Sequence, residues 1–155
     1  MRLTAYTDYS LRVLIYLALN KDRPVTVREI AESYGISRFH LMKVVQQLTN
    51  ESFIEALRGR SGGLRLAMAQ ENIVIGAVVR RMEEEFKIVE CFGDKSLCII
   101  SPACRLKGVL NEALQAFLGV LDSYTLKDLC ARPRALTALF PDAQPKRKDK
   151  KKRKA

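Results

Sequence analysis

The chain has 155 residues, of which 48% are hydrophobic and 28% charged, a composition typical of a soluble globular protein. This length allows one domain with a real core, or one domain plus an appendage. The longest apolar run, from Val13 to Leu19, is far too short to span a bilayer, and the first eight residues lack the apolar segment of a secretory signal. We therefore expect a cytoplasmic protein with no membrane partner, whose cysteines stay reduced and are available for metal or redox chemistry.

The net charge of +10 is concentrated at the C-terminus. The stretch from Lys146 to Lys154 holds eight basic residues and one aspartate, which is +7, so +3 remains for the rest of the chain. Residues 141–155 cannot bury apolar surface, and we expect them to form a disordered basic tail. Such a tail could add non-specific affinity for phosphates or serve solubility alone.

The first predicted helix runs from Thr7 to Leu19, with apolar residues at three- and four-residue spacing and Thr7 as its N-cap. Asp8 then lies in the first turn, where a carboxylate is favoured. Arg12 follows one turn later and can pair with Asp8 across the helix surface. From the residues alone, this ion pair is the preferred role for Asp8.

Two shorter helices are predicted next, from Val27 to Tyr34 and from Ser37, as N-cap, to about Asn50. Thr26 caps the first of them, with Glu29 at the capping-box position, and Gly35 supplies a left-handed turn residue between the two. Two short helices joined in this way form a helix-turn-helix, whose second helix enters the major groove with its N-terminus first.

A β-hairpin is predicted directly after these helices. Residues alternate in character from Phe53 to Arg58 and again through Leu64, Leu66 and Met68, which predicts two strands. The connecting residues Arg58 to Gly63 are rich in glycine and carry two arginines, which suit close approach to a phosphate or a narrow groove. We therefore expect a winged helix that binds DNA. The candidate DNA contacts are Ser37, Arg38, His40 and Lys43 in the groove, with Arg58 and Arg60 on the wing; for His40, a surface position without DNA contact is the alternative.

The second half of the chain is predicted to be helical, apart from one cysteine-containing segment. A helix marked by Ile75 to Met82 ends in the acidic run Glu83 to Glu85, read as a solvated face. The longest helix runs from Pro102 to about Leu121, and its apolar stripe is wider than one small domain requires. We expect part of this stripe to meet a second copy of the chain, the alternative being that its own core uses all of it. Two short terminal helices are predicted, Thr125–Ala131 and Arg134–Phe140. Cys130 is expected to be a core thiol.

Three of the four cysteines lie in one segment, at Cys91, Cys98 and Cys104. Their spacing does not match the Cys-x-x-Cys of zinc knuckles or redox pairs. Thiolates spread in this way suit an iron–sulfur, zinc or copper(I) site, since these metals prefer soft ligands. Ser101-Pro102 reads as a helix start that puts Cys104 in the first turn, where the helix dipole stabilises a thiolate or an anionic cluster. Three half-buried cysteines without a ligand are the alternative.

The predicted fold class is mainly α with a small β-hairpin, a winged helix-turn-helix domain plus a long dimerisation helix. Residues 1–82 form the DNA-binding domain and residues 83–104 the cluster-binding loop. Residues 105–140 supply the dimerisation helix and the C-terminal helices, and residues 141–155 the tail.

Several motifs together resemble those of the bacterial iron–sulfur winged-helix repressors of the NsrR and IscR type, and the NsrR type most closely. The match runs from Met1 to about Phe140, and the combination of motifs is highly specific, while the basic tail lies outside it. The segments that carry the resemblance are Leu3–Arg12, Ile36–His40, Arg58–Leu66, Ser101–Leu106 and Tyr124–Leu129.

The resemblance implies a homodimeric transcriptional repressor that binds double-stranded operator DNA and senses nitric oxide through a 4Fe–4S cluster. It implies that three cysteines, matching Cys91, Cys98 and Cys104, hold the cluster. A fourth ligand would be Asp8 of the partner subunit, with Arg12 beside it. Relatives of the IscR type instead use a histidine three residues after the last cysteine; here that position is lysine and the only histidine is His40, which argues against that type.

On this reading the cluster-bearing form binds the operator, and reaction with nitric oxide releases it. One alternative keeps the DNA-binding dimer but gives it a 2Fe–2S or zinc site that senses iron–sulfur or redox status. Another is an iron–sulfur enzyme or electron carrier. Against an enzyme stand the single histidine and the absence of a nucleotide loop or a paired carboxylate site.

Overall fold

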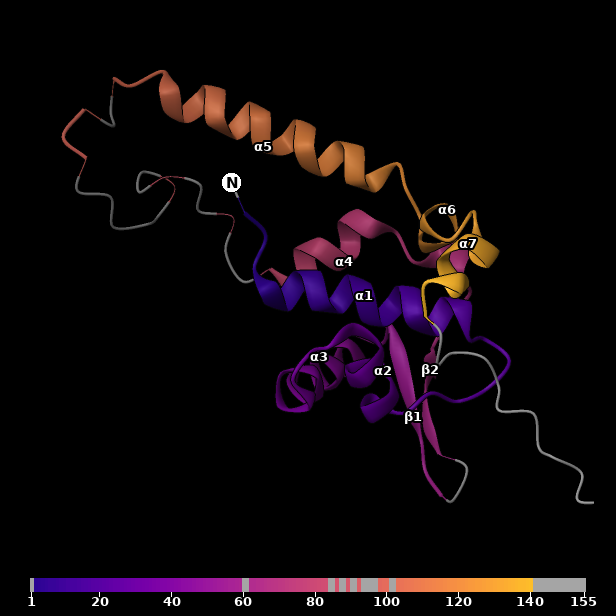
Figure 1. Cartoon of the computed structure of the whole chain (residues 1–155). Coiled ribbons are helices and arrows are strands. Elements are labelled where there is room, and N and C mark those ends of the chain that lie inside the picture. Colours follow the sequence, from indigo (N-terminus) through magenta and orange to yellow (C-terminus); the bar gives the residue numbers. More distant parts are fainter. Residues whose placement is uncertain are drawn as a thin grey trace, which may run out of the picture.

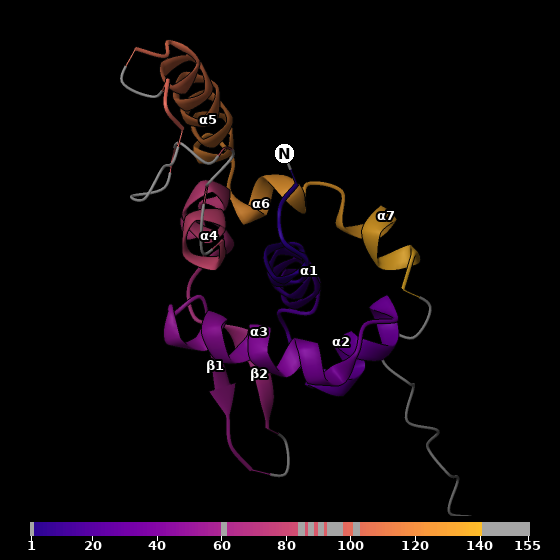
Figure 2. The same cartoon turned by 90° about the vertical axis from the view of Figure 1, so that its left-hand side faces the viewer.

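The fold is organised around its first helix, α1 (Ala5–Leu19). The computed structural model describes residues 2–59, 62–83, 86, 89, 92, 98–100 and 103–140. Figure 2 looks along α1, with α2 and α3 on one side of it and α4 and α6 on the other. Following α1 are α2 (Val27–Tyr34), α3 (Arg38–Asn50), β1 (Ile54–Leu57), β2 (Gly63–Leu66), η1 (Gln70–Asn72), α4 (Ile75–Met82), α5 (Leu106–Asp122), α6 (Leu126–Leu129) and α7 (Pro133–Ala138).

Helix α1 is central because its apolar residues face neighbours on several sides. Val13, Leu14 and Tyr16 are fully buried, and the core continues into α2, α3, α4 and α6. The predicted N-cap, Thr7, is wrong: the helix starts earlier, and the Thr4 hydroxyl accepts from the Thr7 backbone N–H at 3.3 Å. Thr7 is instead buried in the first turn, because its hydroxyl is used in a contact with the end of α4.

Helices α2 and α3 form the predicted helix-turn-helix. The Thr26 hydroxyl accepts from the Glu29 N–H at 3.2 Å, and Gly35 closes α2 in the left-handed conformation with φ of 64°. A side chain is disfavoured in this conformation, so the glycine sets the angle between the two helices. Ser37 stands at the N-cap position of α3, as predicted, but its side chain makes no capping bond.

Strands β1 and β2 form the predicted wing on the same side of α1 as α2 and α3 (Figure 1). They are antiparallel, with Ile54 opposite Leu66. Val25 exchanges backbone bonds of 3.0 and 2.7 Å with Leu64, which fastens the wing to the segment before α2. Met68 lies beyond the second strand, which ends at Leu66, so its predicted place in that strand is wrong.

Helix α5 lies outside α4, on the side away from α1 (Figure 1). Leu114 and Leu118 are its buried residues, and the C-terminal end is held by Arg80 of α4, which donates to both carboxylate oxygens of Asp122 at 2.5 and 2.7 Å. Gly76 makes this possible, since a side chain there would collide with the Asp122 carboxylate. Among the described elements, the contacts of α5 are mainly with α4.

The C-terminal helices return the chain to α1. Thr125 and Asp128 form a reciprocal capping box at the start of α6. Cys130 is buried behind it, which confirms the prediction of a core thiol, and burial raises the pKa of that thiol. Within the described residues, no helix is both long and apolar enough to cross a membrane.

Candidate nucleic-acid interface and cluster site

The outer face of α3 is the first part of the candidate DNA interface. Leu41, Val44 and Leu48 bury the inner face, so the opposite face is left to solvent. The predicted contacts Ser37, Arg38, His40 and Lys43 are all exposed there. The structure thus brings these four residues together on the outside of α3, as the sequence predicts.

Two apolar residues share this exposed face and were missed by the sequence reasoning. Phe39 is 64% exposed and Met42 is 53% exposed. The Lys43 Nζ lies 4.9 Å from the centroid of the Phe39 ring, and the His40 ring centroid lies 6.2 Å from it. Their signal was present in the sequence, because Phe39 and Met42 fall off the core stripe of an otherwise amphipathic helix.

The wing supplies the second part of the candidate interface. Arg58 is exposed at the end of β1, whereas Arg60 lies outside the described residues. In the hairpin turn, Gly62 donates to the Gly59 carbonyl at 3.0 Å, and a side chain at Gly62 would collide with the Leu57 carbonyl. The tight turn therefore needs glycine.

The arginines of the helix-turn-helix and of the wing differ in whether a carboxylate neutralises them. Arg28 pairs with Glu32 at 2.6 Å, and Arg65 pairs with Glu55 at 2.5 Å. Within the described part of the chain, Arg38 on α3 makes no ion pair, and neither does Arg58 on the wing. These two guanidinium groups are available to phosphates, the ligands that arginine matches well.

Asp8 and Arg12 form the ion pair that the sequence favours. The Arg12 Nη2 lies 2.7 Å from Asp8 Oδ2, and Nε donates to Oδ1 at 3.1 Å. Both side chains remain partly exposed in the wall of an open cavity of about 670 Å³, which Tyr9 and Tyr34 also line. The Arg12 guanidinium carbon lies 5.9 Å from the Tyr9 ring centroid and 5.8 Å from that of Tyr34. The carboxylate can therefore be reached from solvent, and Arg12 is held beside it.

The cysteine segment is described only in part. Cys98 and Cys104 are partly exposed, and Cys91 lies outside the described residues. The predicted place of Cys104 in a first helical turn is wrong, because α5 begins at Leu106. The predicted helix start at Ser101 and Pro102 lies outside the described residues. The described residues contain no group of three His, Cys, Asp or Glu side chains that could hold a metal ion. Two soft sulfur donors that are open to solvent nevertheless fit an iron–sulfur group, unlike the buried Cys130.

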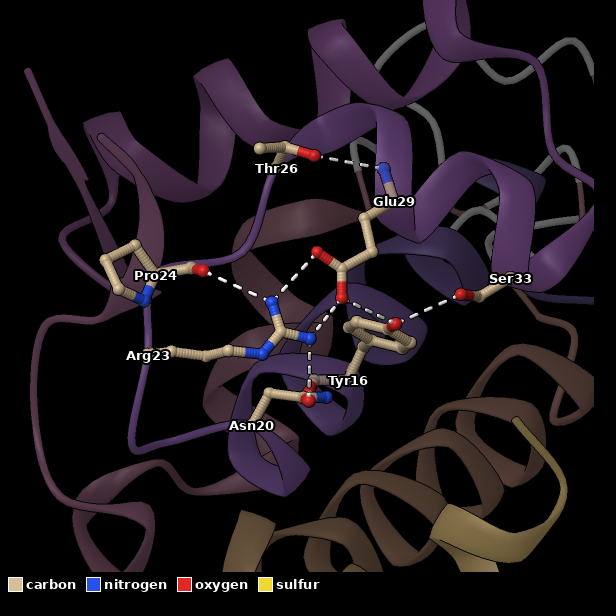
Figure 3. Close-up of polar contacts among 7 residues, drawn as sticks. All are labelled: Tyr16, Asn20, Arg23, Pro24, Thr26, Glu29 and Ser33. Carbon is tan, nitrogen blue, oxygen red and sulfur yellow. Dashed lines mark hydrogen bonds and ion pairs between the residues drawn. The ribbon is translucent and has the colours of Figure 1, made fainter. Parts of the chain in front are cut away.

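A partly buried polar network joins α1 to α2 (Figure 3). The Tyr16 hydroxyl donates to Glu29 Oε1 at 3.1 Å and accepts from the Ser33 hydroxyl at 3.0 Å. Arg23 donates to both Glu29 oxygens, and this bond is the main reason why the pKa of Glu29 is lowered. The capping box predicted for α2 is therefore only half formed: the Glu29 carboxylate serves Arg23 and Tyr16.

Glu83 ties the end of α4 to the start of α1. Its carboxylate accepts from the Thr4 backbone N–H at 3.1 Å, from the Thr4 hydroxyl at 3.0 Å and from the Thr7 hydroxyl. Three donors at the start of α1 converge on Glu83, so the prediction of a solvated acidic face is wrong for this residue, while Glu84 and Glu85 lie outside the described residues. The residue that leads into the cysteine segment is thus bound to the helix turn that carries Asp8.

A helix-turn-helix followed by a wing, with basic residues exposed on the outer face of its second helix, defines a DNA-binding transcriptional regulator of the winged-helix class. The family model of Rrf2, described as iron-dependent transcriptional regulator, matches residues 3–132, so the chain belongs to the Rrf2 family.

Relatives and solved structures agree with this assignment. The chain is 57% identical over 131 residues to the HTH-type transcriptional regulator NsrR of Bacillus subtilis, which covers 83% of this chain and 90% of the relative. Its fold is similar to that of CymR, the global cysteine regulator of B. subtilis, with a TM-score of 0.67, 28% identity and coverage of 84% of this chain and 97% of CymR. T. potens IscR shows the same fold, with a TM-score of 0.69, 24% identity and coverage of 84% and 87%.

These findings confirm the predicted fold class, the resemblance to NsrR, and the expectation that the chain is a regulator and not an enzyme. The domain boundaries and the individual site residues stay predictions.

Proposed function

We propose that the chain is a homodimeric repressor that binds operator DNA and releases it when nitric oxide reacts with a 4Fe–4S cluster. The similarity to NsrR and the family description as iron-dependent support this proposal. The observation that carries it furthest is the contact of Arg12 with both Asp8 and Tyr34. This contact links a candidate cluster ligand to the last residue of α2 in the helix-turn-helix.

The cluster would be held by Cys91, Cys98 and Cys104, with Asp8 of the partner subunit as the fourth ligand. When bound, the cluster supplies an iron with a hard oxygen ligand, at which a small molecule such as nitric oxide can enter. To serve as that ligand, Asp8 would turn one of its two carboxylate oxygens, both of which contact Arg12 here, from Arg12 to the iron. The Arg12 guanidinium also contacts the Tyr9 and Tyr34 rings, so these rings would hold it in place to take the carboxylate back when the ligand is lost.

The outer face of α5 supports a homodimer. Leu106, Val109 and Val120 are 57%, 59% and 59% exposed, although they are large and apolar. Together with Ala113 and Ala116 they follow alternating spacings of three and four residues, the pattern of a helix that pairs with another helix. The two alanines let a second helix approach closely at the middle. A second copy of the chain that pairs through this face would bury all five residues.

Contacts of α1 with the DNA-reading helices provide a physical route for the response. Tyr34 donates to the Arg12 carbonyl at 3.2 Å, and Tyr6 donates to the Lys43 carbonyl of α3 at 2.9 Å. Asp8 lies between Tyr6 and Arg12 on the same helix. A change in what binds Asp8 therefore acts on both helices of the helix-turn-helix, and a small rotation suffices to misplace the two half-site readers of a dimer.

Asp8→Ala tests the proposal in the anaerobically purified, cluster-loaded full chain. The DNA probe is a duplex that the parent protein selects from a random library, and binding is followed by fluorescence anisotropy before and after addition of nitric oxide. In the parent, nitric oxide lowers the affinity for DNA by some factor. We expect that factor to be at least tenfold smaller in Asp8→Ala. The control is Asp22→Ala, because Asp22 is an exposed aspartate beyond the end of α1. If Asp8→Ala binds and releases DNA as the parent does, the carboxylate switch is wrong.

A further inference from the structure

The DNA-reading helix exposes two large apolar side chains that the fold does not need. Phe39 and Met42 each expose more than half of their surface, and neither belongs to the core. They are three residues apart, so they are neighbours on one face of α3. Both lie in the N-terminal half of the helix, the half that contacts base edges in a helix-turn-helix.

The surroundings of these two residues are basic. Lys43 holds its ammonium group over the Phe39 ring, and the His40 ring lies beside that ring, with the two centroids 6.2 Å apart. Arg38 precedes them on the same exposed stretch and has no carboxylate partner within the described residues. An apolar pair flanked by Lys43 and Arg38, which form no ion pair within the described residues, suits a polyanion that also offers apolar groups. Double-stranded DNA is such a ligand, because the 5-methyl group of thymine projects into the major groove between the two phosphate backbones.

Resting on the proposed DNA-binding function, we propose that Phe39 and Met42 read thymine methyl groups in the major groove. Each operator half-site then carries A·T pairs at the positions that face the N-terminal half of α3. Lys43, whose ammonium is stacked on Phe39, holds the ring against the groove and directs charge to the phosphates. Removal of one buried methyl contact weakens an apolar interaction about threefold to fivefold.

The test replaces single thymines by deoxyuridine, which removes the 5-methyl group and keeps the base pair. Duplexes that the cluster-loaded parent selects from a random library are resynthesised with one deoxyuridine at each thymine in turn. We expect one or two positions in each half-site at which the parent loses about threefold to fivefold in affinity. Phe39→Ala or Met42→Ala should lower the affinity for the thymine duplex by a similar factor. At one of those positions, the affinity of the variant should no longer depend on whether the base is thymine or deoxyuridine, as in a double-mutant cycle.

Two control variants separate this contact from general effects. Leu139→Ala removes an exposed apolar side chain at the end of α7 and should bind as the parent does. Met42→Leu keeps an apolar group of similar volume and should keep most of the sensitivity to deoxyuridine. Circular dichroism checks that each variant is folded. We expect all of them to fold, because the side chains of Phe39, Met42 and Leu139 are exposed.

The outcomes distinguish this inference from the proposed function. If the parent selects a sequence but is indifferent to deoxyuridine at every position, thymine-methyl reading is wrong while DNA binding stands. If Phe39→Ala and Met42→Ala weaken binding equally on thymine and deoxyuridine duplexes, these side chains contact something other than the methyl group, which also overturns the inference. If the cluster-loaded parent selects no sequence at all, the proposed function itself fails.

Discussion

Tyr34, the last residue of α2, contacts Arg12 of α1 in two ways. Its hydroxyl donates to the Arg12 carbonyl at 3.2 Å, and its ring centroid lies 5.8 Å from the guanidinium carbon. Burial raises the pKa of Tyr34 to about 12, so the hydroxyl keeps its proton and remains a donor at any physiological pH. Since Arg12 also pairs with Asp8, the candidate cluster ligand and the helix-turn-helix share one side chain.

Tyr34→Phe should weaken the coupling between cluster state and DNA binding. The variant keeps the ring but removes the hydroxyl that holds the Arg12 backbone, at a cost of about 1 kcal/mol in stability. We expect the difference in DNA affinity before and after nitric oxide to shrink, as measured by fluorescence anisotropy. Tyr124→Phe, at an exposed tyrosine near α6, is the matched control. An unchanged difference in Tyr34→Phe would remove Tyr34 from the route.

A single charge on the outer face of α5 should separate the proposed dimer. Val109→Glu places a carboxylate in the apolar stripe, where pairing would bury it without a partner. We expect a monomer by analytical ultracentrifugation at concentrations at which the parent is a dimer. Gln115→Glu, an exposed position of the same helix off the stripe, should stay a dimer. A dimeric Val109→Glu would show that this face is not the interface.

The Glu29 network should stabilise the fold in a pH-dependent way. Hydrogen bonds from Arg23 lower the pKa of Glu29 below its ordinary value of 4.5. The ionised carboxylate therefore contributes stability above pH 4.5, and this contribution is lost as the pH falls through the lower pKa of the folded state. Glu29→Gln should cost about 1–2 kcal/mol at pH 7 by urea denaturation, and the deficit should shrink below pH 4.5.

Glu32→Gln is the control for this network, because its pair with Arg28 lies on the same helix but is exposed. We expect no measurable loss from it. A deficit of Glu29→Gln that is equal at pH 7 and pH 3.5 would contradict the assignment to the ionised carboxylate.

Thiol reactivity should divide the cysteines by burial. Cys130 is buried and burial raises its pKa, so little of it is thiolate near neutral pH. Cys98 and Cys104 are partly exposed. In cluster-free protein at pH 8, iodoacetamide should modify these two before Cys130, as followed by mass spectrometry of peptides. Equal or faster labelling of Cys130 would mean that it is not the core thiol of the structure.

Local signals predicted the winged helix well, because they act over a few residues. Gly35 takes the left-handed conformation that the turn after α2 needs, and Thr26 caps the start of α2. The place of Cys104 in the first turn of α5 was predicted wrongly, because α5 begins at Leu106, and the Ser-Pro pair on which that prediction rested lies outside the described residues. The role of Glu83 could not be predicted, because its partner Thr4 is 79 positions away in the sequence.

The candidate site follows the same rule. The Asp8–Arg12 pair was predictable from its spacing of one helical turn. The contact of the Arg12 guanidinium with the Tyr34 ring was not predictable, since it joins two helices and depends on how they pack. Phe39 and Met42 were overlooked because apolar residues in a helix are first assigned to its core.

Native mass spectrometry of the anaerobically purified chain, during titration with nitric oxide, tests the central claim most directly. We predict a dimer with one 4Fe–4S cluster per chain, whose mass changes at a few nitric oxide molecules per cluster and which loses DNA binding over the same titration. Cys98→Ala should lack the cluster, whereas Cys130→Ala should retain it. A dimer that carries zinc or a 2Fe–2S cluster and does not respond to nitric oxide would contradict the account.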